Sequence, residues 1–373
     1  MKTNQPLKEI AAVFFKLGSI AFGGPAAHIA MMEEEIVTKR KWMSQDHFLD
    51  LMGATNLIPG PNSTEMTMHC GHERGGWLGL IVAGISFLFP AVVITAFFAW
   101  LYQKYGQLPN IQPFVYGIKP AVIAIIISAV YKLGKKALKN VELGILGTLT
   151  LAAALFGLSE IAALFACGFA GVLLYFIKKH KSMTAAFIPL ITLQSIPAVN
   201  LKTMGIFGTF LKVGALLYGS GYVLFAYLDA ELVKTGILSM EQIMDAVAVG
   251  QFTPGPVLST ATFIGWQLGG LPGALAATFG IFLPSFILVA LLNPIIPRMR
   301  QSKAISTFLD AVNIGAVAVI IAVLIKMGWE TLTDWRTIVI ALVSIAITFK
   351  FKKINSALLV FGGSILGYIL TIL

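Results

Sequence analysis

The feature that most constrains the fold of this chain is a pair of Pro-Gly-Pro motifs. They are Pro59-Gly60-Pro61 and Pro254-Gly255-Pro256, and each lies between short apolar segments. Proline lacks a backbone N–H and restricts the residue before it, so the incoming helix must end there, whereas a second proline can begin the next helix. Glycine lets the chain turn between the two. Each motif therefore predicts two short helices that meet at a break: 46–58 with 62–74, and 240–253 with 257–268.

The two breaks belong to an internal duplication. Phe14-Phe15-Lys16-Leu17-Gly18 matches Phe210-Leu211-Lys212-Val213-Gly214, and Lys132-Leu133-Gly134 matches Lys326-Met327-Gly328. The offset between the copies falls only from 196 at the first pair to 194 at the second. Matches that keep their order and nearly keep their register indicate two copies of one unit. We predict an N-terminal repeat at 1–181, a linker at 182–204 and a C-terminal repeat at 205–373.

The composition places most of these segments in a lipid bilayer. Hydrophobic residues make up 57% of the 373 residues, charged residues only 12%, and the mean hydropathy is +0.84. A soluble domain carries about 25% charged residues, and a membrane helix needs about 20 apolar ones. We therefore predict an all-α, multi-pass protein of the cell membrane. The net charge of +10 comes from short basic clusters between apolar runs, which is typical of cytoplasmic loops, so we expect no nucleic-acid partner.

The charge distribution also predicts how the two repeats are oriented. If each Pro-Gly-Pro break is re-entrant, each repeat crosses the membrane five times, and an odd number inverts the second copy. In that topology 17 of the 27 basic residues lie on the cytoplasmic side, including Lys132 and Lys136, and six lie outside. We expect two inverted repeats of about five spans each, with the substrate site at the repeat interface. The sequence leaves open whether residues 9–37 fully span the membrane.

The breaks are also the strongest candidates for a binding site. A half-helix that begins inside the membrane presents free N–H groups and the positive end of its dipole, which attract an anion. Amide and hydroxyl side chains beside the breaks add hydrogen-bond donors. The alternative is a purely structural re-entrant loop that binds nothing. The candidate anion-binding residues at the breaks are Asn56, Gly60, Asn62, Ser63, Thr64, Thr253, Gly255, Ser259 and Thr260.

Five further residues are candidates for the same site. Gly23 and Gly24 break the first apolar segment, and either line the site or only allow close helix packing. Lys16 and Lys212 occupy equivalent apolar positions, where a charge is costly and usually functional, although a lysine near a helix end can also snorkel to the interface. Glu65 follows the first break, where the second copy has a threonine. A buried carboxylate is hard to ionise, so Glu65 is a candidate proton carrier, with a satisfied polar helix start as the alternative.

The motifs of catalytic, metal and nucleotide sites are missing from the sequence. His69 and His72 share a helix, but no further Asp, Cys or His set completes a coordination sphere. Cys70 and Cys167 lack a Cys-x-x-Cys partner, and there is no Gly-x-x-x-x-Gly-Lys phosphate loop. We expect no metal, no cofactor and no enzymatic activity.

The motifs resemble those of the chromate ion transporter family. The family's opening signature is similar to Phe22-Gly23-Gly24-Pro25-Ala26-Ala27-His28-Ile29-Ala30, and its first break to Leu57-Ile58-Pro59-Gly60-Pro61. Its C-terminal domain resembles Gln251-Phe252-Thr253-Pro254-Gly255-Pro256 and Gly280-Ile281-Phe282-Leu283-Pro284. The resemblance covers nearly the whole chain. It implies a long-chain, two-domain secondary transporter that exports chromate, driven by the proton-motive force or by exchange, and that confers chromate resistance.

Several alternatives stay open at this point. A passive anion channel could use the same scaffold, and the anion could be another small one such as sulfate. A membrane-embedded enzyme or receptor would need a catalytic constellation or a soluble sensing domain, and neither is visible in the sequence. The expected partners are the lipid bilayer and a tetrahedral oxyanion, with a homodimer as an open alternative.

Overall fold

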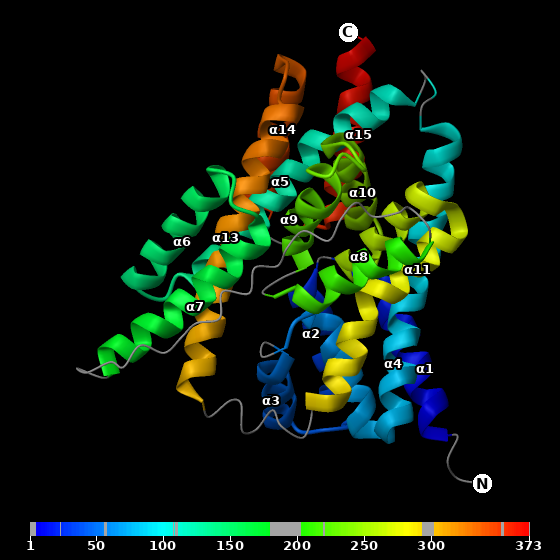
Figure 1. Ribbon diagram of the computed structural model, residues 1–373. Coiled ribbons are helices and arrows are strands. Elements are labelled where there is room, and N and C mark those ends of the chain that lie inside the picture. Colours follow the sequence, from blue (N-terminus) through cyan, green and yellow to red (C-terminus); the bar gives the residue numbers. More distant parts are fainter. Residues whose placement is uncertain are drawn as a thin grey trace.

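The computed structural model describes residues 5–22, 24–55, 58–106, 108, 111–179, 203–218, 221–292, 302–351 and 354–372. Within these ranges the chain is predominantly helical and contains no strand (Figure 1), which confirms the predicted all-α class. The predicted linker lies almost wholly outside the described residues, as do Gly23 and Asn56.

The first repeat consists of a broken segment, a long folded helix and a closing group of three helices. These elements are α1 (Gln5–Ile20), α2 (Pro25–Glu33), the π-helix η1 (Glu34–Lys39), α3 (Gln45–Thr55), α4 (Asn62–Tyr105), α5 (Gln112–Ala137), α6 (Val141–Leu155) and α7 (Glu160–Lys179).

The second repeat follows the same plan. Its elements are α8 (Thr203–Leu216), the 3₁₀ turn η2 (Gly221–Val223), α9 (Leu224–Leu228), the π-helix η3 (Asp229–Val233), α10 (Met240–Phe252), the 3₁₀ turn η4 (Val257–Ser259), α11 (Thr260–Leu292), α13 (Lys303–Thr331), α14 (Trp335–Lys350) and α15 (Ser356–Ile372). Five helices in the described ranges are long and apolar enough to cross a membrane, namely α4, α5, α7, α11 and α13.

The longest helix of each repeat folds back on itself at a Gly-Gly pair. In α4 the backbone leaves the helical region at Gly75 and Gly76, and Gly76 has a φ of 60°, which favours glycine. The two arms then touch through glycines, since a Cβ at Gly71 would lie 2.4 Å from the carbonyl oxygen of Gly79. In α11 the equivalent residues are Gly269, Gly270, Gly265 and Gly273. Each Pro-Gly-Pro break is therefore followed by a tight helical hairpin.

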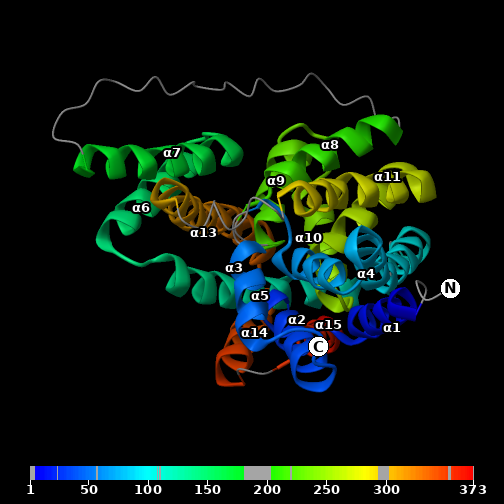
Figure 2. The same cartoon turned by 90° about the horizontal axis from the view of Figure 1, so that it is seen from below.

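The two repeats exchange their closing helices. The hairpins α4 and α11 pack against each other, with α1 on α4 and α8 on α11. The closing pair of the first repeat, α6 and α7, packs on α13 of the second, and α14 with α15 packs on α5 of the first (Figure 2). The boundary between the repeats in sequence is therefore not a boundary in space.

Small residues make this exchange possible at equivalent positions. Gly117 of α5 meets Gly367 of α15 at backbone contact, so that a Cβ at Gly117 would lie 2.7 Å from the Gly367 Cα. In the other repeat Ala311 of α13 meets Gly171 of α7, with 2.5 Å between the Ala311 Cβ and a Cβ at Gly171. Close helix approach through small side chains is a general packing mode in membranes. The equivalence of these contacts aligns α7 with α15.

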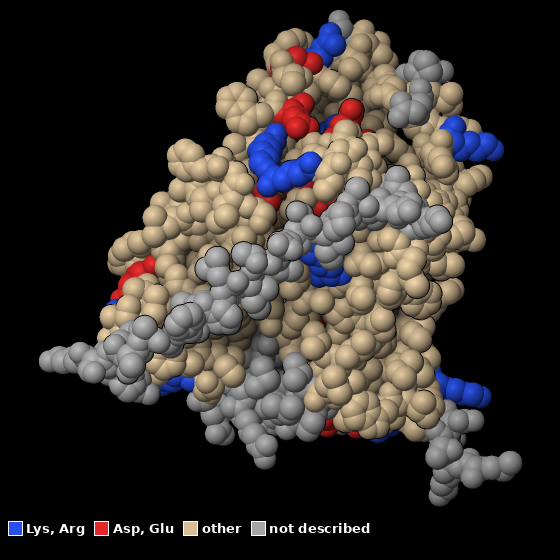
Figure 3. Space-filling model, viewed as in Figure 1, with Lys and Arg blue, Asp and Glu red and all other residues tan. Residues whose placement is uncertain are grey.

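The outer surface is apolar over most of its area. Leu78, Ile85 and Phe89 form an exposed stripe along α4, each more than half exposed. In the view of Figure 3 most of the surface carries no charged side chain, and the charges gather in its upper part and at its edges. A large exposed apolar surface on long helices identifies a multi-pass membrane protein.

Gly214 and Gly208 provide a matched test of the α8–α11 contact. A Cβ at Gly214 would lie 2.2 Å from the Ile281 carbonyl oxygen, whereas a Cβ at Gly208 meets no atom within 4 Å. Gly214→Ala should lower the thermal unfolding midpoint of the detergent-solubilised protein by several degrees, because overpacking costs about 1–3 kcal/mol. Gly208→Ala on the same helix should leave the midpoint unchanged or raise it slightly. Equal midpoints for the two variants would contradict the packing.

Candidate functional site

The two Pro-Gly-Pro loops are held together by a reciprocal pair of backbone hydrogen bonds. The N–H of Gly60 donates to the carbonyl oxygen of Leu217 at 2.7 Å, and the N–H of Gly255 donates to that of Ala21 at 2.8 Å. Ala21 and Leu217 are equivalent residues that directly follow α1 and α8. Each loop is thus bound to the broken first segment of the other repeat. A small cavity touches both loops, through Pro61 and Pro256 among other residues, so the two breaks lie at one place.

The polar groups of the first break are mostly engaged with the protein. His28 is buried, with Nε2 3.1 Å from the Ala21 carbonyl oxygen and Nδ1 3.2 Å from the Ser63 hydroxyl. The Nε2–H therefore donates to the carbonyl, and Ser63 donates to Nδ1. The N–H groups of Thr64 and Glu65 donate to the Pro61 carbonyl oxygen and close the first turn of α4. The hydroxyl of Thr64 is buried and has no hydrogen-bond partner among the described residues.

The second break is built differently from the first. The 3₁₀ turn η4 precedes α11, whereas α4 begins directly after Pro61. The hydroxyl of Thr253 donates to the Val249 carbonyl oxygen at 2.8 Å, and that of Thr260 donates to the Val257 carbonyl oxygen at 2.7 Å. The Ser259 hydroxyl is buried without a hydrogen-bond partner in the part of the chain that the structure describes.

Glu65 lies beneath the first loop, between the two hairpins. It is fully buried, and its Oε1 accepts a 3.5 Å hydrogen bond from the hydroxyl of Ser285 in α11. Its Oε2 has no hydrogen-bond partner in the described ranges. The loop passes so close that a Cβ at Gly60 would lie 2.1 Å from Oε1. A carboxyl group held in this way, with one oxygen unsatisfied, is suited to carrying a proton.

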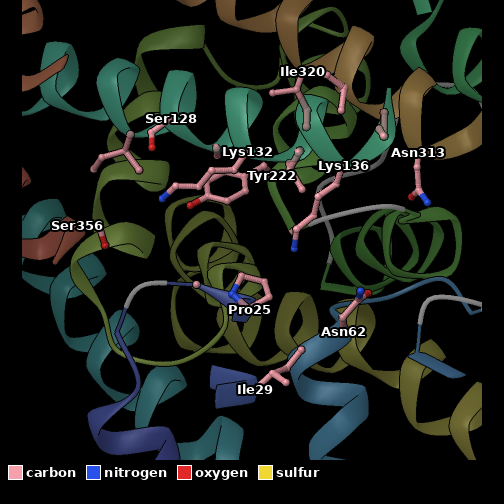
Figure 4. A pocket seen from close by; sticks show the side chains of 18 of the residues that line it. Pro25, Ile29, Asn62, Ser128, Lys132, Lys136, Tyr222, Asn313, Ile320 and Ser356 are labelled. Carbon is pink, nitrogen blue, oxygen red and sulfur yellow. The ribbon is translucent and has the colours of Figure 1, made fainter. Parts of the chain in front are cut away.

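A cavity of about 610 Å³ adjoins the breaks. Gly24, Asn62 and Tyr222 line it at the breaks, and Lys132 and Lys136 line it from α5. Figure 4 shows both lysine side chains reaching into the cavity, across from Pro25 and Asn62. Since a water molecule takes up about 30 Å³ of liquid, the volume is ample for a small anion with part of its hydration shell.

The electrostatics of this cavity favour an anion. Lys132 and Lys136 are exposed, so water reaches them, and no carboxylate among the described residues forms an ion pair with either. The acidic residue in the lining is Asp310, which is already bound to Lys139 at 2.6 Å. Two cations one helical turn apart, without acidic partners, attract an anion of matching charge.

The sequence predicted only that Lys132 and Lys136 are cytoplasmic charges, and not that they line a cavity. The available signal was their i, i+4 spacing, which places both on one face of the apolar helix α5.

Comparison with known proteins identifies the family of the chain. A family model described as "Chromate transporter" matches residues 8–172 and 204–368. The chain belongs to the chromate transporter family. It is therefore a membrane transport protein, as the sequence motifs predicted.

Three relatives of this family member match nearly its full length. It is 31% identical to the chromate transport protein of Cupriavidus metallidurans, over 97% of this chain and 93% of the relative. It is also 31% identical to the probable chromate transport protein of Synechococcus elongatus, over 97% and 95% respectively. An uncharacterized transporter of Methanocaldococcus jannaschii is 27% identical over 99% and 96%. No solved structure matches the chain.

The two lysines singled out from the sequence do not line the cavity of this chromate transporter family member. Lys16 lies 3.7 Å from a carboxylate oxygen of Glu35, and Lys212 lies 2.7 Å from one of Glu231. Burial of the Glu35 carboxyl opposes its ionisation, but the Arg40 hydrogen bond and the nearby Lys16 outweigh it and hold the Glu35 pKa below its ordinary value. Glu35 therefore stays charged and keeps Lys16 paired. A binding role for the two lysines stays a prediction.

The reactivity of a cysteine at position 128 should report the positive charge in the cavity, because Ser128 is part of its lining. We expect Ser128→Cys, with Cys70 and Cys167 replaced by alanine, to react faster with an anionic methanethiosulfonate reagent than with a cationic one. Lys132→Gln combined with Lys136→Gln should lower this rate ratio by at least about tenfold, because a charge about 4 Å away contributes about 1 kcal/mol in water and acts with opposite sign on the two reagents.

Lys135→Gln is the matched control for this measurement. Lys135 is adjacent to Lys136 on α5 but is not part of the lining, so its loss should leave the ratio unchanged. If Lys135→Gln lowered the ratio as much as the double variant, the charge of the cavity would not come from the two lysines.

Proposed function

We propose that this chain is a secondary transporter that exports chromate or a related tetrahedral oxyanion across the cytoplasmic membrane. The observation that carries the proposal is the cavity, in which Lys132 and Lys136 have no acidic partner among the described residues and which touches the first break at Asn62. The Cupriavidus relative is a chromate transport protein and aligns over nearly the whole chain. A tetrahedral dianion matches two lysines and the hydroxyl and amide donors around them.

An inverted-repeat arrangement supports this mechanism. Figure 1 places α1, α2 and α3 in the lower part of the molecule, and the equivalent α8, α9 and α10 in the upper part. We propose that the two copies have opposite topology and that the breaks are re-entrant from opposite sides, so that they meet near the middle of the bilayer. A transporter can then alternate between two related conformations around one site.

The sidedness of the charges supports export as the direction of transport. The cavity contains Lys132, Lys136 and Lys139, which the positive-inside rule assigns to the cytoplasmic side. In this conformation the cavity opens toward that side, and a cytoplasmic anion can enter it. We propose that the anion moves to the break junction and leaves on the outer side after the conformational change.

Flux into proteoliposomes tests the proposed function directly. Labelled chromate should accumulate against its gradient when a pH gradient or a counter-anion is supplied, and unlabelled sulfate should compete to an extent that measures its affinity. A flux that only dissipates the chromate gradient would establish a channel instead. Lys132→Gln with Lys136→Gln should raise the KM at least about tenfold, and Lys135→Gln should not, because only the first two residues line the cavity.

Glu65 is the proposed proton carrier. Glu65→Gln keeps the shape of the side chain and its contact with Ser285 but cannot exchange a proton. If transport is proton-coupled, the variant should lose the pH dependence of chromate flux and the stimulation by a pH gradient, while counter-anion exchange persists. Glu142→Gln is the control, because Glu142 forms an exposed ion pair with Lys178 and should not affect coupling. An unchanged pH profile in Glu65→Gln would rule out this role.

A further inference from the structure

A second group of charged residues, with buried carboxylates and partly exposed lysines, lies away from the cavity. Glu160, at the start of α7, is 1% exposed and binds Lys234 at 2.7 Å and Lys326 at 3.2 Å. Lys326 also binds Asp229, which is 2% exposed, at 2.6 Å. We call Glu160, Asp229, Lys234 and Lys326 the ion cluster. It joins α7 of the first repeat to η3 and α13 of the second, and the transport proposal above does not use it.

The duplication relates this ion cluster to the cavity. Lys326 is the repeat equivalent of Lys132. Each lysine lies two residues before a glycine, in Lys132-Leu133-Gly134 and Lys326-Met327-Gly328, and the two motifs are 194 residues apart. Glu160 is equivalent to Ser356, because each is the first residue of its helix and the helices align through their equivalent close contacts at Gly171 and Gly367. Ser356 also lines the cavity, where its hydroxyl donates to the Gln251 carbonyl oxygen at 3.2 Å. Equivalent positions therefore differ between the two repeats. Lys326 is paired with the Glu160 carboxylate, whereas Lys132 and Ser356 line the open cavity.

The ion cluster lies further along α13 than the cavity, and on a different face of that helix. Asp310, Asn313 and Ile320 line the cavity along α13. Lys326 lies six residues beyond Ile320 on the same helix, or about 9 Å further along its axis.

We propose that Lys326 and Lys234 form a second oxyanion site on the exit side of the pathway, and that Glu160 closes it here by occupying the place of the anion. The proposal rests on the transport function proposed above. A carboxylate presents to the two ammonium groups the same charged oxygens that an oxyanion would present. In the opposite conformation Glu160 leaves the lysines, the anion binds them, and the cavity at Lys132 closes. Glu160 is thus an internal competitor that keeps the exit closed while the cytoplasmic side is open.

Two reporter positions allow a test that does not require transport. Ser128 lines the cavity, and its repeat equivalent Ala322 is fully buried on α13 near the ion cluster. In a background with Cys70 and Cys167 replaced by alanine, Ser128→Cys should react quickly with an anionic methanethiosulfonate reagent, and Ala322→Cys slowly. Each substitution is measured separately in purified full-length protein reconstituted in nanodiscs.

Exchanging the residues between the two repeats should exchange the accessibility. Glu160→Ser should raise the reaction rate at position 322 about tenfold and lower the rate at position 128. Lys234 then loses its carboxylate partner and Lys326 keeps only Asp229, which favours the conformation in which the exit is open. Ser356→Glu gives Lys132 a carboxylate and should by itself lower the rate at position 128. Glu160→Gln is the second variant in case Glu160→Ser folds poorly, and the same direction of change is expected.

Glu142→Ser provides the control, because it removes a carboxylate from an exposed ion pair with Lys178 and should change neither rate. A faster reaction at position 322 with an unchanged rate at position 128 would mean that Glu160 only stabilises local packing, and would overturn the proposal. So would unchanged rates in both Glu160→Ser and Ser356→Glu. The expected reciprocal change together with an absence of chromate flux would instead uphold the gate and refute the proposed substrate.

Discussion

The reciprocal hydrogen bonds between the repeats are the interaction on which the rest of the structure depends. The N–H groups of Gly60 and Gly255 donate to the carbonyl oxygens of Leu217 and Ala21, so each loop satisfies the backbone at the broken segment of the other copy. A backbone group left unsatisfied in hydrocarbon costs several kcal/mol, so irregular chain at membrane depth must find partners within the protein. Neither repeat could bury its break alone. The junction therefore exists only where the two copies meet.

The two copies share one scaffold but differ in their charged residues, and this difference makes the two sides of the molecule unequal. Lys132 and Ser356 line the open cavity, while Lys326, the equivalent of Lys132, is bound to Glu160. Glu65 follows the first break only, because the second copy has a threonine there. A symmetric pair of repeats would present the same surface to both sides of the membrane. In the mechanism that we propose, acidic residues in one copy keep one side closed while the other is open.

Much of the local structure was predictable, because backbone chemistry determines it. Proline ended α3 and α10 within a few residues of the predicted positions, and α4 begins at Asn62 as predicted. The exchange of closing helices was not predictable. Apolar helices carry no strong partner signal in their composition, and α6 and α7 pack on α13 because small residues such as Gly171 fit there. For the same reason the sequence did not reveal that Lys132 and Lys136 line a cavity.

The sequence by itself determined the membrane class, the duplication and the positions of the breaks, because these follow from composition, internal repetition and proline chemistry. The family came from the resemblance of its motifs. The tertiary structure alone decided which charged side chains form ion pairs and which do not. Lys16 and Lys212 are paired with Glu35 and Glu231, and Lys132 lacks an acidic partner within the described ranges. The pairing of a charge depends on contacts between segments distant in sequence. Only the folded chain brings those segments together.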